Sequence, residues 1–149
     1  MNVKVVPYNP LDQQGVKEVV LKGFKEFGFN YNPKYDSDLD NPSTYFNSGG
    51  SFFVLKNDAK VIGTIAVINK GDSIAELKRM YVDKDYQKRG YGSLLFNKAL
   101  DFCRRHNFKK LEFETNKKFT EAHEFYKKRG CEIVDEDERS YYMEKMLWT

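Results

Sequence analysis

The fold is decided largely by one stretch, Val82-Asp-Lys-Asp-Tyr-Gln87-Lys-Arg-Gly90-Tyr-Gly92-Ser-Leu-Leu95. A predicted strand leads into it, and apolar residues at helical spacing follow it. Glycines at positions 90 and 92 allow a tight turn whose backbone can lie close to a ligand. The N–H groups at the start of the following helix, together with the charges of Lys88 and Arg89, are typical of a phosphate-binding site.

The turn excludes two common nucleotide motifs. A dinucleotide fingerprint needs a third glycine where Leu95 stands, and a P-loop needs the pattern GxxxxGK[ST], which the chain lacks. The remaining pattern, Gln87-x-x-Gly90-x-Gly92 after a strand, fits two interpretations equally well. It is a phosphate cradle, or it is a glycine-rich turn that only joins a strand to a helix.

The flanking segments predict a mixed α/β domain. Strands are predicted at residues 3–8, 51–55, 60–68, 74–82, 110–115, 131–135 and 140–147. Helices are predicted from Asn9-Pro10 to Gly28, from the glycine turn to residue 105, and from Thr120, as the N-cap, to Gly130. Residues 29–50 are predicted to form a long loop that could include a short helix. Short turns favour antiparallel pairing of the three middle strands, and the helix between strands 74–82 and 110–115 favours a parallel pair.

Length and composition indicate one folded domain, residues 1–149. Hydrophobic residues make up 40% of the chain, and 12 Phe, 10 Tyr and 1 Trp exclude a largely disordered protein. The net charge of +3 gives no support for nucleic-acid or membrane binding. Two cysteines and two distant histidines form no disulfide framework and no metal site. Because no signal-peptide core or membrane-spanning stretch is present, we expect a soluble, cytoplasmic protein.

Two segments together resemble the GNAT N-acetyltransferase superfamily. The first, Ala75-Glu-Leu-Lys-Arg-Met-Tyr-Val82 with Gln87-Lys-Arg-Gly-Tyr-Gly-Ser-Leu-Leu95, is similar to that superfamily's acetyl-CoA signature. The second, Glu114-Thr-Asn116 with Glu121-Ala-His-Glu-Phe-Tyr-Lys-Lys-Arg-Gly130, is similar to its second conserved segment. The resemblance implies a mixed, mostly antiparallel central sheet flanked by helices, in which strand 74–82 splays away from strand 110–115.

The resemblance also implies acetyl-CoA as the acetyl donor, an amine as the acceptor, and no metal. The pyrophosphate of CoA would lie on backbone N–H groups from Gln87 to Gly92, and the pantetheine arm would lie between the splayed strands. A backbone N–H near Tyr81 or Val82 would polarise the thioester carbonyl. The residues implied to bind acetyl-CoA are Met80, Tyr81, Val82, Gln87, Lys88, Arg89, Gly90, Tyr91, Gly92, Ser93 and Asn116.

The implied catalytic residues are Tyr126 and Glu76. Tyr126 matches the family's general acid, and a phenol with an ordinary pKa of about 10 can protonate the leaving thiolate at neutral pH. Periodicity alone favours simple packing of Tyr126 beside Ala122 and Phe125. Glu76 stands where the family often has an acidic residue, so it is either the base for the incoming ammonium or an exposed charge on a strand.

The acceptor amine and the state of assembly are open. Asp36, Asp38 and Asp40, interleaved with aromatic residues, suit a cationic acceptor, or they are ordinary turn-forming residues. The acceptor class ranges from polyamines, aminoglycosides and amino acids to protein amines, and a homodimer is compatible with the sequence. A non-catalytic acyl-CoA-binding module on the same fold is the alternative function, because fold alone does not fix activity.

Overall fold

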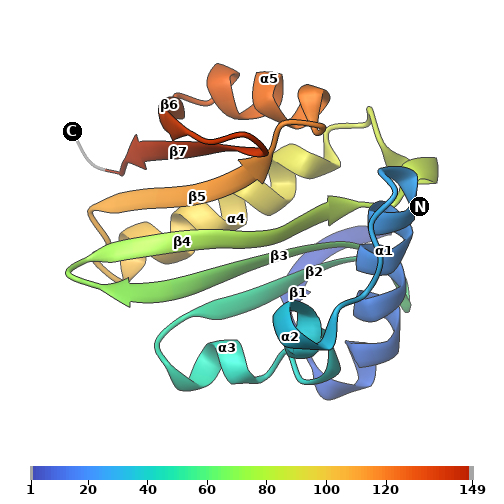
Figure 1. Ribbon diagram of the computed structural model, residues 1–149. Coiled ribbons are helices and arrows are strands. Elements are labelled where there is room, and N and C mark those ends of the chain that lie inside the picture. The colour runs from blue at the N-terminus through green and yellow to red at the C-terminus, as the bar shows by residue number, and fades with distance from the viewer. Residues whose placement is uncertain (1, 148–149) are drawn as a thin grey trace.

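The computed structural model describes residues 2–147, and these form one seven-stranded sheet with helices on both faces (Figure 1). The strands are β1 (Val3–Pro7), β2 (Ser51–Asn57), β3 (Lys60–Gly71), β4 (Ile74–Val82), β5 (Lys110–Asn116), β6 (Glu132–Glu136) and β7 (Ser140–Met146). Their order in the sheet is β1-β2-β3-β4-β5-β7-β6. The three long helices are α1 (Gln13–Glu26), α4 (Tyr91–Arg105) and α5 (Thr120–Lys128). The predicted mixed α/β fold is confirmed.

One junction in the sheet differs from all the others. Neighbouring strands are antiparallel except β4 and β5, which run parallel because α4 carries the chain back between them. These two strands pair at only three positions, Ile74 with Lys110, Ala75 with Leu111, and Glu76 with Glu112. Beyond Glu76 they diverge, as Figure 1 shows, so the predicted splay is present.

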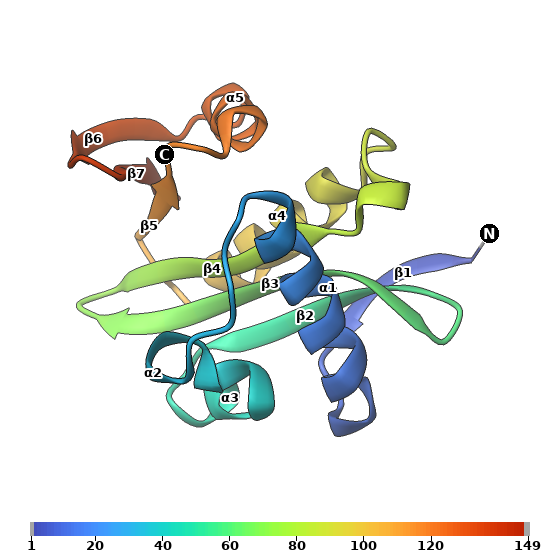
Figure 2. The same cartoon turned by 45° about the vertical axis from the view of Figure 1, so that its right-hand side comes forward.

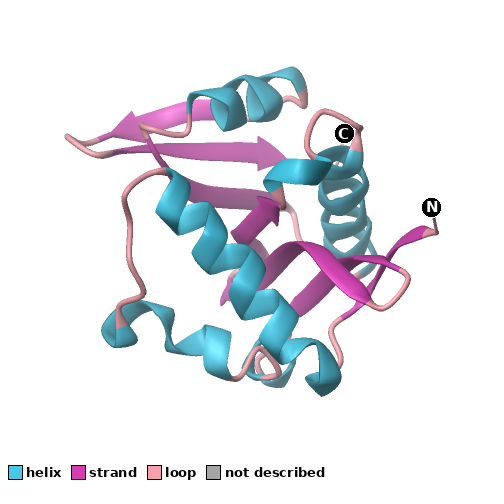
Figure 3. Cartoon of the chain, turned by 90° about the vertical axis from the view of Figure 1, so that its right-hand side faces the viewer, coloured by secondary structure: helices cyan, strands magenta, loops and turns pink. Residues whose placement is uncertain are grey.

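The sheet lies between two hydrophobic cores. α1 and α4 cover opposite faces (Figure 2), and Figure 3 shows the strands between the two helical layers. Val16 of α1 is fully buried on one side, and Leu95 of α4 is fully buried on the other. Alternation along β2 serves both cores, since Phe52 packs toward α1 and the next residue, Phe53, toward α4.

Residues 29–50 are more regular than their composition predicts. They contain α2 (Pro33–Asp36) and α3 (Thr44–Asn47), with a 3-10 turn at Ser37–Asp40. The Asn32 side chain accepts a hydrogen bond from the Lys34 N–H and caps α2. Leu39 and Tyr45 are buried in the core beneath α1, so tertiary packing orders a segment that lacks a periodic pattern.

The two predicted helix caps have different outcomes. Asn9 and Pro10 do begin a helical segment, a 3-10 turn at Pro10–Asp12, in which Asn9 and Asp12 form a capping box before α1. The N-cap prediction for Thr120 is wrong. Thr120 is already the first residue of α5, and the cap position holds Phe119, whose side chain cannot accept a hydrogen bond.

Candidate active site

A groove of about 980 Å³ opens between β4 and β5 where their pairing ends. Its walls come from the end of β4, the turn at residues 83–90, the first turn of α4, the end of β5, and α5, with the end of α1 at one side. Most of the residues predicted to bind acetyl-CoA line it together with Tyr126, namely Met80, Tyr81, Val82, Gln87, Lys88, Gly90, Tyr91, Gly92, Ser93 and Asn116. Arg89 and Glu76 are not part of these walls.

A bulge near the end of β4 turns a backbone N–H into this groove. Thr64 pairs with Tyr81 but Ala66 pairs with Lys78, so Arg79 and Met80 together oppose a single residue of β3. Thr64 Oγ1 donates a hydrogen bond of 2.7 Å to the Arg79 carbonyl. Because the C=O and N–H of a trans peptide point in opposite directions, the Met80 N–H points away from β3 and toward the groove.

The same arrangement recurs at the end of the strand. The Asp83 N–H donates to the Ile62 carbonyl on β3 at 2.8 Å, while the Val82 carbonyl of that same peptide accepts a bond of 2.9 Å from Gln87 Nε2. Since backbone groups alternate between the two edges of a strand, the Tyr81 N–H faces β3 and the Val82 N–H faces the groove. The donors presented to a ligand are therefore those of Met80 and Val82, and not that of Tyr81.

The glycine turn forms as the sequence predicts. Gly90 is the N-cap of α4 and has a φ of 84°, in the left-handed region where a Cβ is unfavourable. A Cβ at Gly92 would lie 3.3 Å from the Phe125 ring, so glycine lets the start of α4 approach α5 closely. The first turn of α4 thereby presents its N–H groups at one end of the groove.

A cation that sequence reasoning did not single out lies at the same end. Arg129 stacks on the Phe125 ring at 3.6 Å and donates to the Phe125 carbonyl at 3.0 Å. Its Nη2 also donates to Ser93 Oγ in the first turn of α4. In the sequence Arg129 is one of three consecutive basic residues, and only its position four residues after Phe125 on the helix distinguishes it. Arg89, by contrast, lies over the Tyr86 ring and donates to the Asp85 carbonyl at 3.3 Å.

The position of Tyr126 is compatible with both interpretations from the sequence, packing in the core and proton donation in the groove. Its ring is packed among apolar side chains, with the Phe113 ring centroid 4.5 Å away, and the residue is only 7% exposed. Its hydroxyl nevertheless reaches Met80 of β4, with Oη 3.5 Å from Sδ. Burial raises the pKa of Tyr126 well above its ordinary value, so the phenol is protonated at neutral pH.

Glu76 lies apart from these groups. It is the last β4 residue that pairs with β5, opposite Glu112. Its neighbour Glu112 forms ion pairs with Lys70 and Lys110, so Glu76 lies beside a cluster of charged side chains. The structure thus does not bring Glu76 to Tyr126, and its role as a base stays a prediction that its position does not favour.

Asn116 lies at the groove but is occupied by its own turn. Its side chain accepts a hydrogen bond from the Lys118 N–H at 2.9 Å, and its carbonyl oxygen lies 3.0 Å from His123 Nε2. The residue therefore shapes the connection between β5 and α5. Contact with the pantetheine arm remains a prediction for Asn116.

The acidic loop does not offer free carboxylates. Asp36 and Asp38 form ion pairs with Arg79 at 3.0 and 2.7 Å. Asp40 pairs with Lys17 and accepts a hydrogen bond from the Tyr31 hydroxyl. The interpretation of these aspartates as a receptor for a cationic acceptor is therefore not supported, because each already has a partner within the chain.

A different set of side chains, from the end of α1, β5 and the start of α5, also lines the groove. Phe27 at the end of α1 and Phe119 before α5 meet edge to face, with ring centroids 4.6 Å apart. The carboxylates of Glu26, Glu114 and Glu121 line the same groove. This mixture of aromatic and acidic groups could accommodate an organic amine. This set could not be recognised in the sequence, because its members come from three separate segments.

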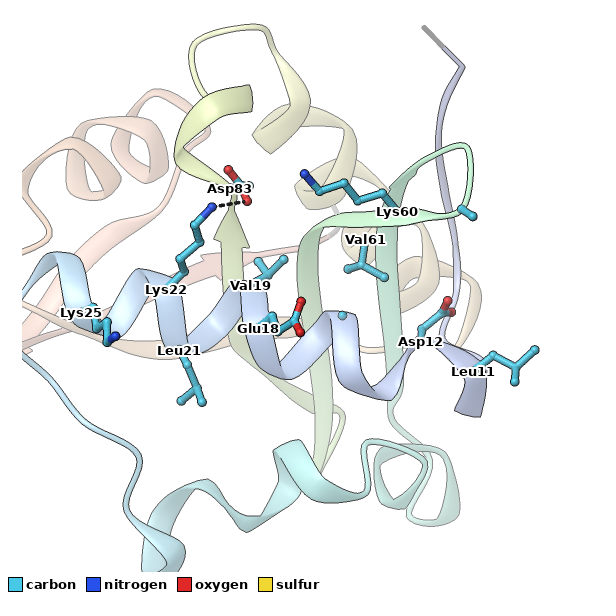
Figure 4. Close-up of a pocket in the computed structure, with 12 residues that line it drawn as sticks. Leu11, Asp12, Glu18, Val19, Leu21, Lys22, Lys25, Lys60, Val61 and Asp83 are labelled. Atoms are coloured by element: carbon cyan, nitrogen blue, oxygen red, sulfur yellow. Dashed lines mark hydrogen bonds and ion pairs between the residues drawn. The ribbon is translucent and has the colours of Figure 1, made fainter.

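A second cavity, of about 670 Å³, lies between α1, the start of β3 and Asp83 (Figure 4). Lys22 and Asp83 line both this cavity and the groove, and they form an ion pair of 3.1 Å. Asp83 also accepts a hydrogen bond from the Asp85 N–H at 3.0 Å, so the pair ties α1 to the start of the glycine turn.

Every His, Cys, Asp and Glu side chain lies within residues 2–147, the part of the chain that the structure describes. No group of three or more His, Cys, Asp or Glu side chains in this part of the chain could hold a metal ion. Burial raises the pKa of the Cys103 thiol to about 12 and that of Cys131 to about 11, so neither is a reactive thiolate at neutral pH. Within the same residues, no helix has the length and apolar character needed to cross a bilayer.

Comparison with known proteins agrees with this geometry. The model of the acetyltransferase (GNAT) family matches residues 19–131. The chain is 29% identical to an N-acetylaspartate synthetase of Xenopus tropicalis over 101 residues, which cover 66% of the chain and 37% of the frog protein. It is 28% identical to streptothricin acetyltransferase A of Bacillus subtilis over 104 residues, 70% of the chain and 60% of that protein. The chain thus spans less than two thirds of either relative.

Solved structures share the whole fold. An acetyltransferase of the GNAT family from Staphylococcus aureus superposes with a TM-score of 0.90 at 26% identity, covering 99% of this chain and all of that one. The paia N-acetyltransferase of Thermoplasma acidophilum, solved in complex with coenzyme A, superposes with a TM-score of 0.84 at 19% identity, covering 98% of this chain and 99% of that one.

Proposed function

The chain belongs to the GNAT acetyltransferase family, and on this premise we propose that it transfers an acetyl group from acetyl-CoA to a primary amine by direct attack. The observation that carries the proposal is the arrangement in the groove. The N–H groups of Met80 and Val82 are presented at an unpaired strand edge, and the buried hydroxyl of Tyr126 lies beside Met80. An extended pantetheine arm suits such an edge, as added strands do in β-augmentation.

The pyrophosphate of CoA is proposed to bind at the glycine turn. Backbone N–H groups in the first turn of a helix, here those of Gly92 and Ser93, have no acceptor within the helix, and the helix dipole favours an anion there. Arg129 and Lys88 supply positive charge at the same end of the groove. The anion is thus recognised by a local concentration of donors, although the net charge of the chain is only +3.

In the proposed reaction, a base first takes one proton from the alkyl ammonium and passes it to solvent, which leaves a neutral amine. The neutral amine attacks the thioester carbon, and the oxygen that gains negative charge accepts hydrogen bonds from the Met80 N–H, a contribution of about 2.7–4 kcal/mol per donor in other enzymes. The C–S bond then breaks, and Tyr126 gives its proton to the departing thiolate. The nitrogen loses one proton, and Tyr126 regains one, so the products are an N-acetyl amine and CoA thiol.

A base must take the proton that the nitrogen loses. Glu76 is the candidate from the sequence, but Glu114 lies in the groove, where its Oε2 accepts a hydrogen bond of 2.7 Å from Ser140 Oγ. The variants Glu76→Gln and Glu114→Gln distinguish the two candidate bases. The position of Glu114 predicts that its variant loses the acidic limb of the pH–rate profile, and loss of that limb in Glu76→Gln instead would restore the sequence-based assignment.

Two measurements test the proposal as a whole. Titration calorimetry with acetyl-CoA measures binding, and a thiol-release assay over a panel of primary amines measures transfer. We expect acetyl-CoA to bind and thiol to appear only with an accepted amine. Absence of binding would reject the proposal, whereas binding without turnover over the whole panel would favour a non-catalytic acyl-CoA-binding module.

A further inference from the structure

The bulge that frees the Met80 N–H contains a strained residue. Arg79 has a φ of 58°, in the left-handed region that is sterically unfavourable for a residue with a Cβ. Such a conformation persists only where the surroundings impose it. The contacts of Arg79 therefore indicate what holds the bulge in place.

The Arg79 side chain is held by carboxylates from another part of the chain. Its Nε and Nη2 donate to the two oxygens of Asp38 at 2.9 and 2.7 Å, a bidentate pair, and Nη2 also donates to Asp36 at 3.0 Å. Tyr45 donates its hydroxyl to Asp38 at 2.6 Å. The side chains of Arg79, Asp36 and Asp38 are only 10%, 10% and 20% exposed. Buried bidentate pairs of this kind fix geometry well.

The backbone of the bulge is held from the other side by Thr64. This residue is fully buried, and its hydroxyl donates to the Arg79 carbonyl, which fixes the plane of the peptide between Arg79 and Met80. We call Arg79, Asp36, Asp38 and Thr64 the bulge clamp. Its members come from β4, the α2 region and β3, so the bulge is secured on both sides.

The clamp decides which backbone group faces the groove. Without the extra residue, the pairing of Ala66 with Lys78 would place Met80 opposite Thr64, where Tyr81 now lies. A shift of one residue exchanges the two faces of a strand. The Met80 N–H would then bond to β3, and its side chain would leave Tyr126.

We infer that the bulge clamp positions the Met80 N–H against the thioester carbonyl, with Asp38 and Thr64 as positioning residues that touch neither substrate. This rests on the proposed function. On this inference, the acidic loop holds the bulge in place, whereas its composition suggests that it binds a cationic acceptor. Asp38 acts on the backbone donor through Arg79, and the acceptor is bound elsewhere.

The chain provides a matched control for the test. Asp40 lies in the same 3-10 turn as Asp38, but its carboxylate pairs with Lys17 and Tyr31 and not with Arg79. Asp40→Asn therefore makes the same chemical change two residues away without touching the bulge clamp. Asp38→Asn and Thr64→Val weaken the clamp from opposite sides while nearly keeping the side-chain shape.

The experiment measures kcat, the affinity for CoA, and the infrared carbonyl band of bound acetyl-CoA labelled with ¹³C at the carbonyl. We expect Asp38→Asn and Thr64→Val each to lower kcat by about 100-fold, as expected for loss of one oxyanion donor, with CoA affinity changed less than about twofold. The carbonyl band should move to higher frequency in both variants, because polarisation is lost. Asp40→Asn should match the wild type.

Three outcomes decide the matter. If the wild type neither binds nor turns over acetyl-CoA, the proposed function fails, and this inference fails with it. If the wild type is active but either folded clamp variant keeps both its kcat and its carbonyl band, the clamp does not position the donor. If CoA affinity falls as much as kcat, or if Asp40→Asn behaves like Asp38→Asn, the loop has only a general structural role.

Discussion

Tyr126→Phe removes one hydroxyl from the floor of the groove and should separate catalysis from stability. Among the described residues, this hydroxyl donates to the Met80 sulfur at 3.5 Å, a weak acceptor. The free energy of unfolding should therefore change by no more than about 1 kcal/mol. General acid catalysis contributes about 10²–10⁴-fold in rate, or about 3–5 kcal/mol at 1.36 kcal/mol per tenfold. We expect kcat to fall within that range.

The assay is thiol release at saturating acetyl-CoA and amine, with unfolding in urea followed in parallel. Tyr142→Phe is the matched control, because its hydroxyl donates to Asp137 at 2.8 Å and lies outside the groove. Affinity for CoA should be unchanged in both variants. A kcat for Tyr126→Phe within about threefold of the wild type would refute the assignment of Tyr126 as the acid, since even weak general acids contribute more than this.

Three further perturbations probe the turn and the loop. Arg129→Gln should weaken CoA binding about tenfold or more in titration calorimetry, because a charge-assisted hydrogen bond to the CoA anion is lost. Lys128 is exposed and lies outside the groove, so Lys128→Gln is the control and should leave CoA binding unchanged. Gly90→Ala should lower the free energy of unfolding, measured in urea, by about 1–2 kcal/mol. The cost comes from the φ of 84° alone, because apart from the adjacent residues no atom lies within 4 Å of the added methyl; an unchanged free energy of unfolding would contradict this. Burial would raise the pKa of Asp38, but hydrogen bonds from Arg79 and Tyr45 outweigh it and lower that pKa. The ionised form of Asp38 therefore stabilises the fold at pH values above the unfolded pKa of about 3.9. The difference in free energy of unfolding between the wild type and Asp38→Asn should disappear as the pH falls below about 4. A difference that does not depend on pH would show that the charge of Asp38 is not involved.

The order of strands and helices could be predicted because each element has a recognisable pattern of residues within its own segment of the sequence. Alternation marked the strands, helical spacing marked α1, α4 and α5, and Gly90 with Gly92 marked the turn between β4 and α4. The parallel junction and its splay followed once the crossover helix was recognised. These features depend on residues that are close together in the sequence, so one sequence is enough to predict them.

The bulge at Arg79 could not be predicted in the same way. One extra residue in a nine-residue strand leaves the apolar pattern almost intact, yet it reverses which N–H groups face the groove. The partners of Arg79 lie about 40 residues earlier in the chain, so Asp36 and Asp38 looked like free acidic residues in a loop. Arg129 was obscured for a related reason, because its contact with Ser93 spans 36 residues.

The proposed direct attack makes one prediction that no acetyl-enzyme mechanism shares. Rapid mixing of the protein with acetyl-CoA, with no amine present, should release no CoA thiol, because in direct transfer the acetyl group passes only to the acceptor amine and never to a side chain of the groove. Addition of an accepted amine should then release thiol and form N-acetyl amine in equal amounts. A burst of thiol equal to the protein concentration before any amine is added would contradict direct transfer in the groove.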